Sequence, residues 1–300
     1  MIKTKKAKFT GLEFSTIGFG ASPFGNIYND HVSEDQAKSL VKKAIENGIT
    51  YFDVAPYYGL SRAEVVLGKS LPKKKNSIIL STKIGRYGEN KFDFSKNTIE
   101  RSINQSLKNL KTDHINIIFC HDIEFVPEEI IIQEALPTLQ KLKQKGIISH
   151  IGISGYPLKL LSKISKNNIV DIVLSYGHYN ILNQELFNYL EEFKRNNVDI
   201  INASPFCMGL LTKNNCPSWH PYKEKKEITK LIKSLPSNLN IEKESFQFTL
   251  NQNQFTTTLT GIAKEKDLSD ILYWANNKIN EKNQNQIKNM FKSYQNINWA

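Results

Sequence analysis

The 300-residue sequence has little cysteine and no long hydrophobic run. Its three cysteines, Cys120, Cys207 and Cys216, are too few and too widely spaced for a disulfide framework or a zinc knuckle, so we expect neither disulfides nor a metal site. No apolar stretch approaches the ~20 residues that a membrane-spanning helix needs. The basic start of the chain is not followed by the apolar segment of a secretory signal. Together these absences predict a cytoplasmic protein with no membrane partner.

Acidic charge is also scarce relative to basic charge, with 29 Asp and Glu against 40 Lys and Arg and a net charge of +11. A positive field marks a nucleic-acid site only where the charge is clustered. The two clusters, Lys73–Lys75 and Lys223–Lys230, lack interleaved aromatic residues, and no zinc-finger or RNA-binding motif appears. Charge runs of this kind usually form solvated surface. We therefore expect no nucleic-acid partner, and keep a basic nucleic-acid binder as the least favoured alternative.

Short β-branched apolar runs alternate with longer amphipathic stretches along the chain. The strand-like runs are Ser15–Phe19, Ile49–Asp53, Ile78–Thr82, Ile115–Cys120, Ile148–Ile153, Asp171–Leu174, Asp199–Asn202 and Thr256–Thr260. Each is followed by a stretch with helical signals, which predicts parallel strands joined by crossover helices. Because eight such units are what a (β/α)8 barrel requires, we predict an α/β protein with one TIM-barrel domain over residues 1–300. A doubly wound open sheet is the alternative.

The helices expected between the strands begin at recognisable signals. Ser33–Gln36 has the pattern of a capping box that opens a helix ending near Asn47, and Ser61–Glu64 has the same S-x-x-E type of start. Further helices are expected over 97–110, 128–145, 157–166, 184–196, 241–252 and 265–277. The Thr10-Gly11 pair between apolar residues predicts a β-hairpin that plugs the barrel bottom, and residues 281–292 predict an extra C-terminal helix. The irregular stretch 204–224 is a candidate functional loop.

Four different ionisable side chains follow three successive predicted strands: Asp53, Tyr58, Lys83 and His121. Functional residues of such barrels lie at the carboxyl ends of the strands, so these side chains are expected together. A phenol has a pKa of about 10, and a nearby ammonium lowers it by favouring the phenolate. We assign Tyr58 as general acid/base, Lys83 as the group that lowers its pKa, Asp53 as partner of Lys83, and His121 as orienting group and proton relay.

A single Asp, Lys or His at a strand end is more often an ordinary satisfied polar residue. Four residue types at three neighbouring strand ends favour a catalytic set over that simpler interpretation. Tyr57 is the alternative to Tyr58 for the catalytic role. Cys120 alternates away from His121 along its strand, so we expect it in the core.

These residues lie in motifs that resemble the aldo-keto reductases over essentially the whole chain. The motifs are T-G-L-E-F-S at 10–15, I-G-F-G at 17–20, F-D-V-A-P-Y-Y-G at 52–59, S-T-K at 81–83 and S-P at 204–205. The resemblance implies a barrel with Asp53, Tyr58, Lys83 and His121 as the catalytic tetrad and Tyr58 as proton donor. Loop stretches such as S-T-K-I-G-R-Y-G at 81–88 and C-H-D-I-E-F at 120–125 resemble the plant-type L-galactose dehydrogenases within this family.

The resemblance also implies a nicotinamide dinucleotide bound without the G-x-G-x-x-G fingerprint, which the sequence lacks. By family position, its contacts are Gly20, Ala21, Ser22, Asp53, Ser154, Tyr176, Ser204, Pro205, Met208, Gly209, Leu210, Gly261, Ala263, Lys264, Asp267 and Asp270. The chain departs from the usual residues at Gly155, Tyr176, Ala203 and Ile271. Asp267 stands where many NADP-preferring members carry arginine, and a carboxylate repels a 2′-phosphate, so NAD is favoured over NADP. Lys264 and Lys266 are the residues that would oppose this preference.

The activity implied is oxidation of an aldose at C1 to its lactone, with hydride transfer to the nicotinamide. The aldose is L-galactose or a stereochemically related sugar such as L-fucose or D-arabinose. The candidate substrate contacts are Asn26, Tyr28, Asp122, His178, Trp219 and His220. The alternatives are an NADPH-dependent carbonyl or pyridoxal-type reductase and a non-catalytic cofactor-binding regulatory subunit. We expect a monomer or weak homo-oligomer.

Overall fold

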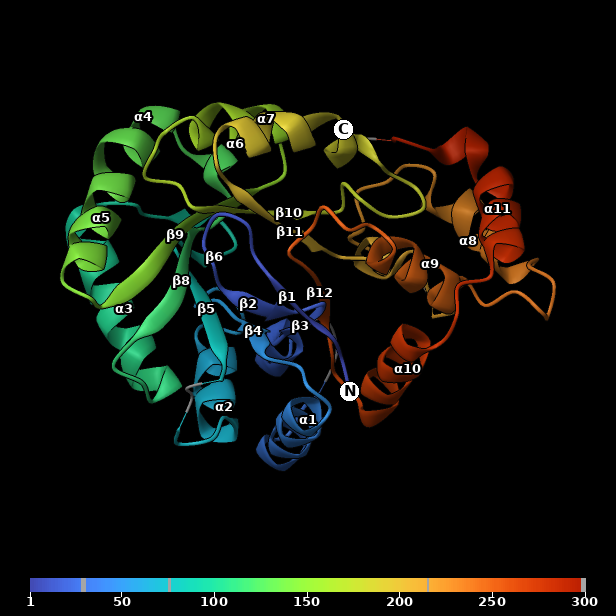
Figure 1. Ribbon diagram of the computed structural model, residues 1–300, viewed down its shortest axis with the longest axis horizontal. Coiled ribbons are helices and arrows are strands. Elements are labelled where there is room, and N and C mark those ends of the chain that lie inside the picture. Colours follow the sequence, from blue (N-terminus) through green and yellow to red (C-terminus); the bar gives the residue numbers. More distant parts are fainter. Residues whose placement is uncertain (28–30, 75–76, 215, 298–300) are drawn as a thin grey trace.

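The computed structural model describes residues 1–27, 31–74, 77–214 and 216–297. Eight parallel strands close into a barrel, and β12 pairs with β3 to complete the ring (Figure 1). The strands are β3 (Ile17–Gly20), β4 (Tyr51–Asp53), β5 (Ile79–Ile84), β8 (Ile115–Cys120), β9 (Ile148–Gly155), β10 (Ile172–Tyr176), β11 (Asp199–Ala203) and β12 (Thr257–Gly261). The predicted (β/α)8 barrel is confirmed, and the open-sheet alternative is wrong.

Helices surround the barrel (Figure 1). They are α1 (Glu34–Glu46), α2 (Arg62–Ser70), α3 (Lys96–Leu110), α4 (Glu128–Ile130), α5 (Leu136–Gln144), α6 (Leu158–Ser165), α7 (Leu190–Arg195), α8 (Lys225–Lys233), α9 (Ile241–Leu250), α10 (Glu265–Asn276) and α11 (Glu281–Met290). Short 3-10 turns occupy Ser22–Gly25, Ile123–Phe125, Glu185–Tyr189, Cys207–Gly209 and Lys292–Tyr294. The predicted C-terminal helix is present as α11, whereas α8 was not predicted. No helix among the described residues is long and apolar enough to cross a membrane.

The stretch predicted as one helix over 128–145 is interrupted. Residues Ile131–Ala135 form a π-helical turn between α4 and α5, and Pro137 is the second residue of α5. Proline has no backbone N–H, and its ring clashes with the carbonyl four residues earlier, so regular α-helical bonding cannot run through this point. The helix therefore widens immediately before the proline.

The two predicted helix starts differ. Ser33 forms the capping box, because its hydroxyl accepts from the N–H of Gln36 and the Gln36 side chain accepts from the N–H of Ser33. A helix begins after Ser61 as predicted, but Ser61 does not cap it. Ser61 is left-handed (φ 71°) and makes no side-chain cap. Glu64 is instead buried and accepts from Thr82 of β5 at 2.7 Å, which fastens α2 to the strand that carries Lys83.

The amino-terminal hairpin covers the barrel bottom. Its strands are β1 (Thr4–Lys6) and β2 (Glu13–Ser15), on either side of the predicted Thr10-Gly11 turn. Ser15 was assigned to the first barrel strand but belongs to β2. The carboxylate of Asp199, at the start of β11, accepts from the backbone N–H groups of Lys8 and Thr10. The hairpin is thus anchored at the amino-terminal ends of the strands, opposite the end where the functional residues lie.

Two apolar layers hold the barrel. The interior is filled by side chains that include Ile79, Ile117, Phe119, Ile172, Leu174, Ile201 and Leu259. A larger cluster lies between the strands and the helices, and it contains Cys120, as predicted. Because the interior is packed, solvent reaches the chemistry only at the mouth formed by the carboxyl ends of the strands.

Candidate active site

Strands β4 and β5 place a buried ion pair at the barrel mouth. Asp53 lies opposite Ser81 in the β4–β5 register, and Lys83 follows two residues later on the same face of β5. The Lys83 Nζ donates to Asp53 Oδ1 at 2.5 Å and to the Val54 carbonyl at 3.0 Å. Ser81 Oγ donates to the second oxygen of Asp53 at 2.6 Å. With exposed fractions of 2% for Lys83 and 3% for Asp53, the pair is almost dry.

Tyr58 lies in the turn after β4, and the geometry separates its role from that of Tyr57. The Lys83 ammonium is 5.0 Å from the centre of the Tyr58 ring, whereas the His121 ring meets both tyrosines edge-on, Tyr58 at 5.8 Å and Tyr57 at 6.0 Å. The guanidinium of Arg86 lies instead 4.0 Å from the centre of the Tyr57 ring. Tyr58 is therefore the tyrosine next to the buried lysine, and Tyr57 is the one that packs against Arg86.

The turn that presents Tyr58 depends on close backbone contact. Gly59 has φ 63°, and a Cβ atom at this position would lie 2.2 Å from the carbonyl oxygen of Gly25. Only glycine permits both this left-handed conformation and this approach. The Tyr-Gly order of the motif thus has a steric cause.

The pKa of Tyr58 moves in the direction opposite to the one expected from the sequence. Burial raises the pKa of Tyr58 well above its ordinary value, and the carboxylates of Asp53 and Asp122 raise it further, while Arg86 opposes them. Lys83 does not reverse this, because its charge is compensated by Asp53 at 2.5 Å. Tyr58 therefore holds its proton in this structure and is poised as a hydrogen-bond and proton donor.

His121 follows β8 and is a neutral group. Desolvation lowers the pKa of His121 to about 3, with Lys83 and Arg86 acting in the same direction and Asp122 against it. Its buried Nδ1 has no hydrogen-bond partner in the described part of the chain, and its Nε2 lies 3.6 Å from Asp122 Oδ2. A neutral imidazole can donate from one nitrogen and accept at the other. His121 is thus suited to orient a substrate oxygen, and to pass a proton only by accepting one as it releases another.

Arg86 is a central residue of the mouth that the sequence interpretation did not select. It lies in a hairpin of β6 (Arg86–Gly88) and β7 (Lys91–Phe92) that was not predicted. Its Nη1 donates to Asp122 Oδ2 at 2.5 Å, while the rings of Phe92 and Phe125 flank the guanidinium. The motif at 81–88 had marked this stretch, but its bonding to Asp122, 36 residues away, is not a local property of the sequence.

Glu124 and Tyr176 extend this polar cluster. The Tyr176 hydroxyl lies 3.3 Å from Asp122 Oδ1 and 3.5 Å from Glu124 Oε1. Glu124 Oε1 also accepts from the N–H of Tyr156 at 2.9 Å. Burial, and secondarily the Asp122 carboxylate, raises the pKa of Glu124 to about 7. Glu124 was missed because a lone glutamate in a loop gives no signal of its own.

Several residues expected at the cofactor line the same mouth. The Ala21 N–H donates to the Asp53 carbonyl at 2.8 Å, which places the Gly20–Ser22 segment against the tetrad. Ser154 at the end of β9 is buried and its hydroxyl has no partner among the residues that the structure describes. After β11, Ser204, Met208 and Gly209 all have positive φ, as does Cys207, with Pro205 and Leu210 in the same tight loop. A buried hydroxyl without a partner and a tightly folded loop, both at the carboxyl ends of barrel strands, fit a polar ligand such as a nicotinamide dinucleotide.

At the start of α10, the expected adenosine end of the site carries its own anion. Asp267 Oδ2 accepts from the backbone N–H groups of Ala263 and Lys264 at 3.2 and 2.9 Å. Lys266 is paired with Asp270 at 2.5 Å. Gly261 ends β12 immediately before this segment. The two backbone amides just before α10, those of Ala263 and Lys264, are therefore already bonded to a carboxylate, which opposes a further phosphate there.

The expected substrate residues fall into two groups. Asp122 lies with the tetrad, and His178 is buried with its ring 4.3 Å from that of Tyr156. The other three described candidates lie in loops: Asn26 accepts from the N–H of Val32, Trp219 is 53% exposed, and His220 is bonded through both ring nitrogens, to the Cys207 carbonyl and the Tyr222 N–H. We assign Asn26 and His220 to holding their loops, because the chain itself satisfies them. Tyr28 lies outside the described residues.

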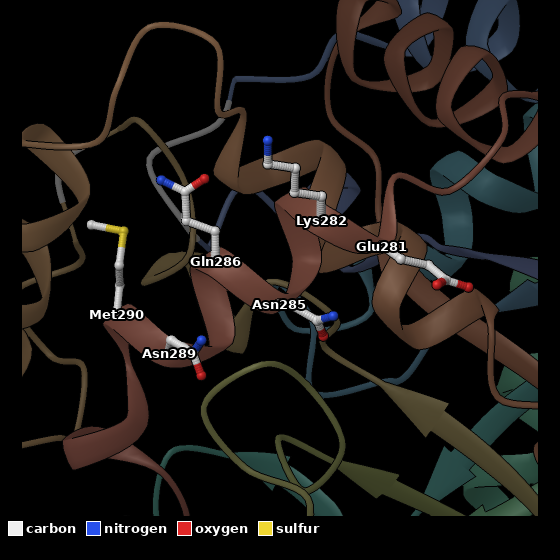
Figure 2. A pocket seen from close by; sticks show the side chains of 6 residues that line it. All are labelled: Glu281, Lys282, Asn285, Gln286, Asn289 and Met290. Atoms are coloured by element: carbon white, nitrogen blue, oxygen red, sulfur yellow. The ribbon is translucent and has the colours of Figure 1, made fainter.

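Within the described residues, neither a metal-binding cluster nor the hollow on α11 competes with the barrel mouth. The described part of the chain contains no group of three His, Cys, Asp or Glu residues that could hold a metal ion. A hollow on α11 is lined by Glu281, Lys282, Asn285, Gln286, Asn289 and Met290 (Figure 2). All six side chains come from one helix and include one carboxylate and one ammonium, so they form no converging reactive set.

Comparison with known proteins agrees with this geometry. The chain is 38% identical to L-galactose dehydrogenase of Arabidopsis thaliana over 270 residues, covering 87% of this chain and 84% of the relative. It is 31% identical to D-arabinose 1-dehydrogenase of Saccharomyces cerevisiae, covering 74% and 70%. The holo structure of an aldo-keto reductase from Bacillus halodurans superposes with a TM-score of 0.81 at 23% identity, over 97% and 96% of the two chains. Since the sequence profile of the Aldo/keto reductase family also matches residues 16–292, this chain belongs to that family.

Proposed function

We propose that the protein is an NAD(P)-dependent aldose dehydrogenase that oxidises a cyclic sugar at C1 to its lactone. The proposed sugar is L-galactose or a relative with the same stereochemistry around C2 to C4, such as L-fucose or D-arabinose. The observation that carries the proposal is the buried Asp53–Lys83 pair beside Tyr58 and His121 at the barrel mouth. The two relatives named as sugar dehydrogenases support the choice of substrate class.

The proposed roles follow from the states of the side chains. Bound nicotinamide would supply the hydride acceptor. Tyr58 faces the anomeric oxygen and exchanges its proton, and the neutral His121 holds that oxygen in place. Lys83 is kept charged and oriented by Asp53. Ser154, Tyr176 and the 204–210 loop are the residues that would hold the dinucleotide, and Asp122 is the proposed contact for a sugar hydroxyl.

Steady-state kinetics with a panel of pentoses and hexoses against aldehydes and pyridoxal test this proposal. We expect turnover of L-galactose, L-fucose or D-arabinose with NAD at a kcat/KM higher than that for any aldehyde reduction. The protonated state of Tyr58 favours one rival in particular, the carbonyl or pyridoxal-type reductase, because carbonyl reduction consumes a proton. Aldehyde turnover without sugar turnover would establish that rival. Nucleotide binding without turnover of any substrate would establish a regulatory subunit.

The cofactor preference gives a separate prediction at Asp267. Replacing it with asparagine keeps an oxygen that accepts from the Ala263 and Lys264 amides but removes the negative charge. We expect the affinity for NADP relative to NAD to rise by roughly tenfold, about 1.4 kcal/mol, because one repulsion of the 2′-phosphate is lost. Titration of the purified protein with both nucleotides measures this ratio.

The matched control is Glu134→Gln, which removes an exposed carboxylate on the π-helical turn and should leave the ratio unchanged. A wild-type protein that binds NADP tenfold more tightly than NAD would contradict the preference for NAD. An unchanged ratio in Asp267→Asn would remove Asp267 as its cause.

A further inference from the structure

Two carboxyl groups share one hydroxyl at the edge of the active site. The Tyr176 hydroxyl lies within hydrogen-bond distance of Asp122 Oδ1, at 3.3 Å, and of Glu124 Oε1, at 3.5 Å. It carries a single proton, so it can donate to only one of them at a time. The second oxygen of Glu124 is buried and has no partner in the structure. Burying an unpartnered carboxylate oxygen costs more free energy than burying a neutral, protonated carboxyl group.

The charges around Glu124 also favour a protonated Glu124 carboxyl group. Among the described residues, the charged or titratable residues packed against it are Asp122 from its own loop, Arg86 from β6, Tyr176 from β10 and Tyr156 after β9, whose N–H donates to Glu124 Oε1. The Arg86 guanidinium forms an ion pair with Asp122 at 2.5 Å. One cation therefore serves two carboxyl groups, and two close carboxylates cannot both ionise freely. The cluster is neutral when one proton resides on Glu124.

This cluster reaches the tetrad through His121. Asp122 Oδ2 lies 3.6 Å from His121 Nε2, slightly longer than a hydrogen bond, and the His121 ring lies edge-on to Tyr58. Catalytic hydrogen bonds are often longer in ligand-free structures than in complexes. The order of contacts is thus Tyr58, His121, Asp122, Tyr176 and Glu124.

We propose that Glu124 and Asp122 share a proton across the Tyr176 hydroxyl, and that Glu124 takes up the proton released by sugar oxidation. The second half rests on the function proposed above. Neither Tyr58 nor His121 is suited to hold that proton, because the resting Tyr58 is already protonated and the His121 cation is strongly disfavoured. Glu124, with a pKa of about 7, gains and loses its proton near neutrality. Glu124 does not touch the substrate; it acts through Tyr176, Asp122 and His121 as a positioning and relay residue.

Oxidation of the sugar at C1 releases one hydride and one proton. The sugar C1–H bond breaks and its electron pair leaves as hydride to an oxidised nicotinamide, while the anomeric O–H bond breaks and the lactone C=O bond forms. The hydroxyl proton moves to Tyr58 as the phenolic proton moves to His121, which releases its other ring proton to Asp122. Asp122 then passes that proton to the Tyr176 oxygen as the Tyr176 hydroxyl proton moves to the Glu124 carboxylate, so Asp122 and Tyr176 return to their starting states. One proton is released and one carboxylate is neutralised, and solvent later removes that proton.

Gly155 offers a way to disturb Glu124 without removing its carboxyl group. A Cβ atom at Gly155 would lie 2.4 Å from Glu124 Oε2, and its other near neighbours are at 3.4 Å. The obstacle is the tip of a flexible side chain, so Gly155→Ala should fold and move the carboxyl group away from Tyr176. Glu124→Gln and Gly155→Ala therefore test the proposal by different routes.

The first measurement uses the cofactor-free protein with 13C-labelled glutamate carboxyl groups. We expect one carboxyl resonance to titrate with a midpoint near 7, to vanish in Glu124→Gln, and to move toward the ordinary glutamate value of about 4.3 in Gly155→Ala. Asp122→Asn should also lower the midpoint, because it removes the competing negative charge. Titration of Glu124 near 4.3 in the wild type would overturn the shared proton.

The second measurement is the pH profile of sugar oxidation. A base must be deprotonated to accept a proton, so log kcat/KM should rise as the pH rises through about 7 and then level off. In Glu124→Gln this limb should disappear, with kcat at pH 8 lower by roughly tenfold, less than the 10²- to 10⁴-fold effect of a group that acts on substrate directly. Glu129→Gln, an exposed neighbour, is the control that should keep the wild-type profile.

The two measurements fail independently. If the wild type turns over no sugar, the proposed function is wrong, yet the carboxyl titration still decides whether Glu124 and Asp122 share a proton. If sugar is oxidised and Glu124→Gln keeps the wild-type pH profile, the proposed function survives and the relay is wrong.

Discussion

Replacement of Tyr58 by phenylalanine should lower kcat by roughly 10²- to 10⁴-fold, the usual contribution of a general acid or base. The ring would still fill its place beside Lys83 and His121, so the loss would report the hydroxyl alone. The affinity for the dinucleotide should remain nearly that of the wild type. Stopped-flow or steady-state measurement of hydride transfer, together with a nucleotide titration, separates the two effects.

Tyr57→Phe is the matched control, because it removes a hydroxyl one residue away and keeps the ring that carries Arg86. It should retain most of the activity. If Tyr58→Phe kept wild-type turnover while Tyr57→Phe lost it, the assignment would pass to Tyr57. Wild-type turnover in both variants would exclude a tyrosine as proton donor.

The second large effect is expected at Lys83. Replacing it with methionine would leave the carboxylate of Asp53 buried without its cation, and breaking a buried pair in this way costs about 3–5 kcal/mol. The free energy of unfolding, measured with urea, should fall by that amount, and activity should be lost as well. Lys91→Met, at an exposed position of β7, is the control and should change the stability by less than about 0.5 kcal/mol.

A double variant separates the pairing from the loss of packing. Asp53→Asn combined with Lys83→Met removes both charges, so it should recover part of the stability that Lys83→Met loses but none of the activity. If the double variant were as unstable as the sum of the two single variants, the ion pair would not be the source of the effect.

The sequence by itself predicted the barrel and the meeting of four ionisable side chains at its mouth. Both depend on local patterns: eight β-branched runs, each followed by helical signals, and ionisable residues immediately after three of those runs. Strand ends in a closed barrel must meet at one rim, so position along the chain was sufficient to bring Asp53, Lys83 and His121 together. The Ser33 capping box was predictable for the same reason, since all of its partners lie within one turn.

Features that depend on burial and distant partners were not predictable in this way. Ser61–Glu64 has the same pattern as a capping start, but Glu64 is buried between α2 and β5, where it accepts a hydrogen bond from Thr82. The pKa of Tyr58 was expected to fall because Lys83 is near, and it rises because burial and two carboxylates outweigh a lysine that is already paired. Proximity in the sequence shows neither how far a group is desolvated nor whether a neighbouring charge is already paired.

The cluster of Arg86, Asp122, Glu124 and Tyr176 shows this limit most clearly. Its members come from three separate loops and strand ends, and the hydroxyl of Tyr176 meets a carboxylate 54 residues away. Periodicity and turn signals record which residues face inward, but they do not record which loops meet above the barrel. The sequence determined the barrel and the set of ionisable residues at its mouth, whereas the tertiary structure decided their protonation states, because these depend on burial and on charges brought together only by folding.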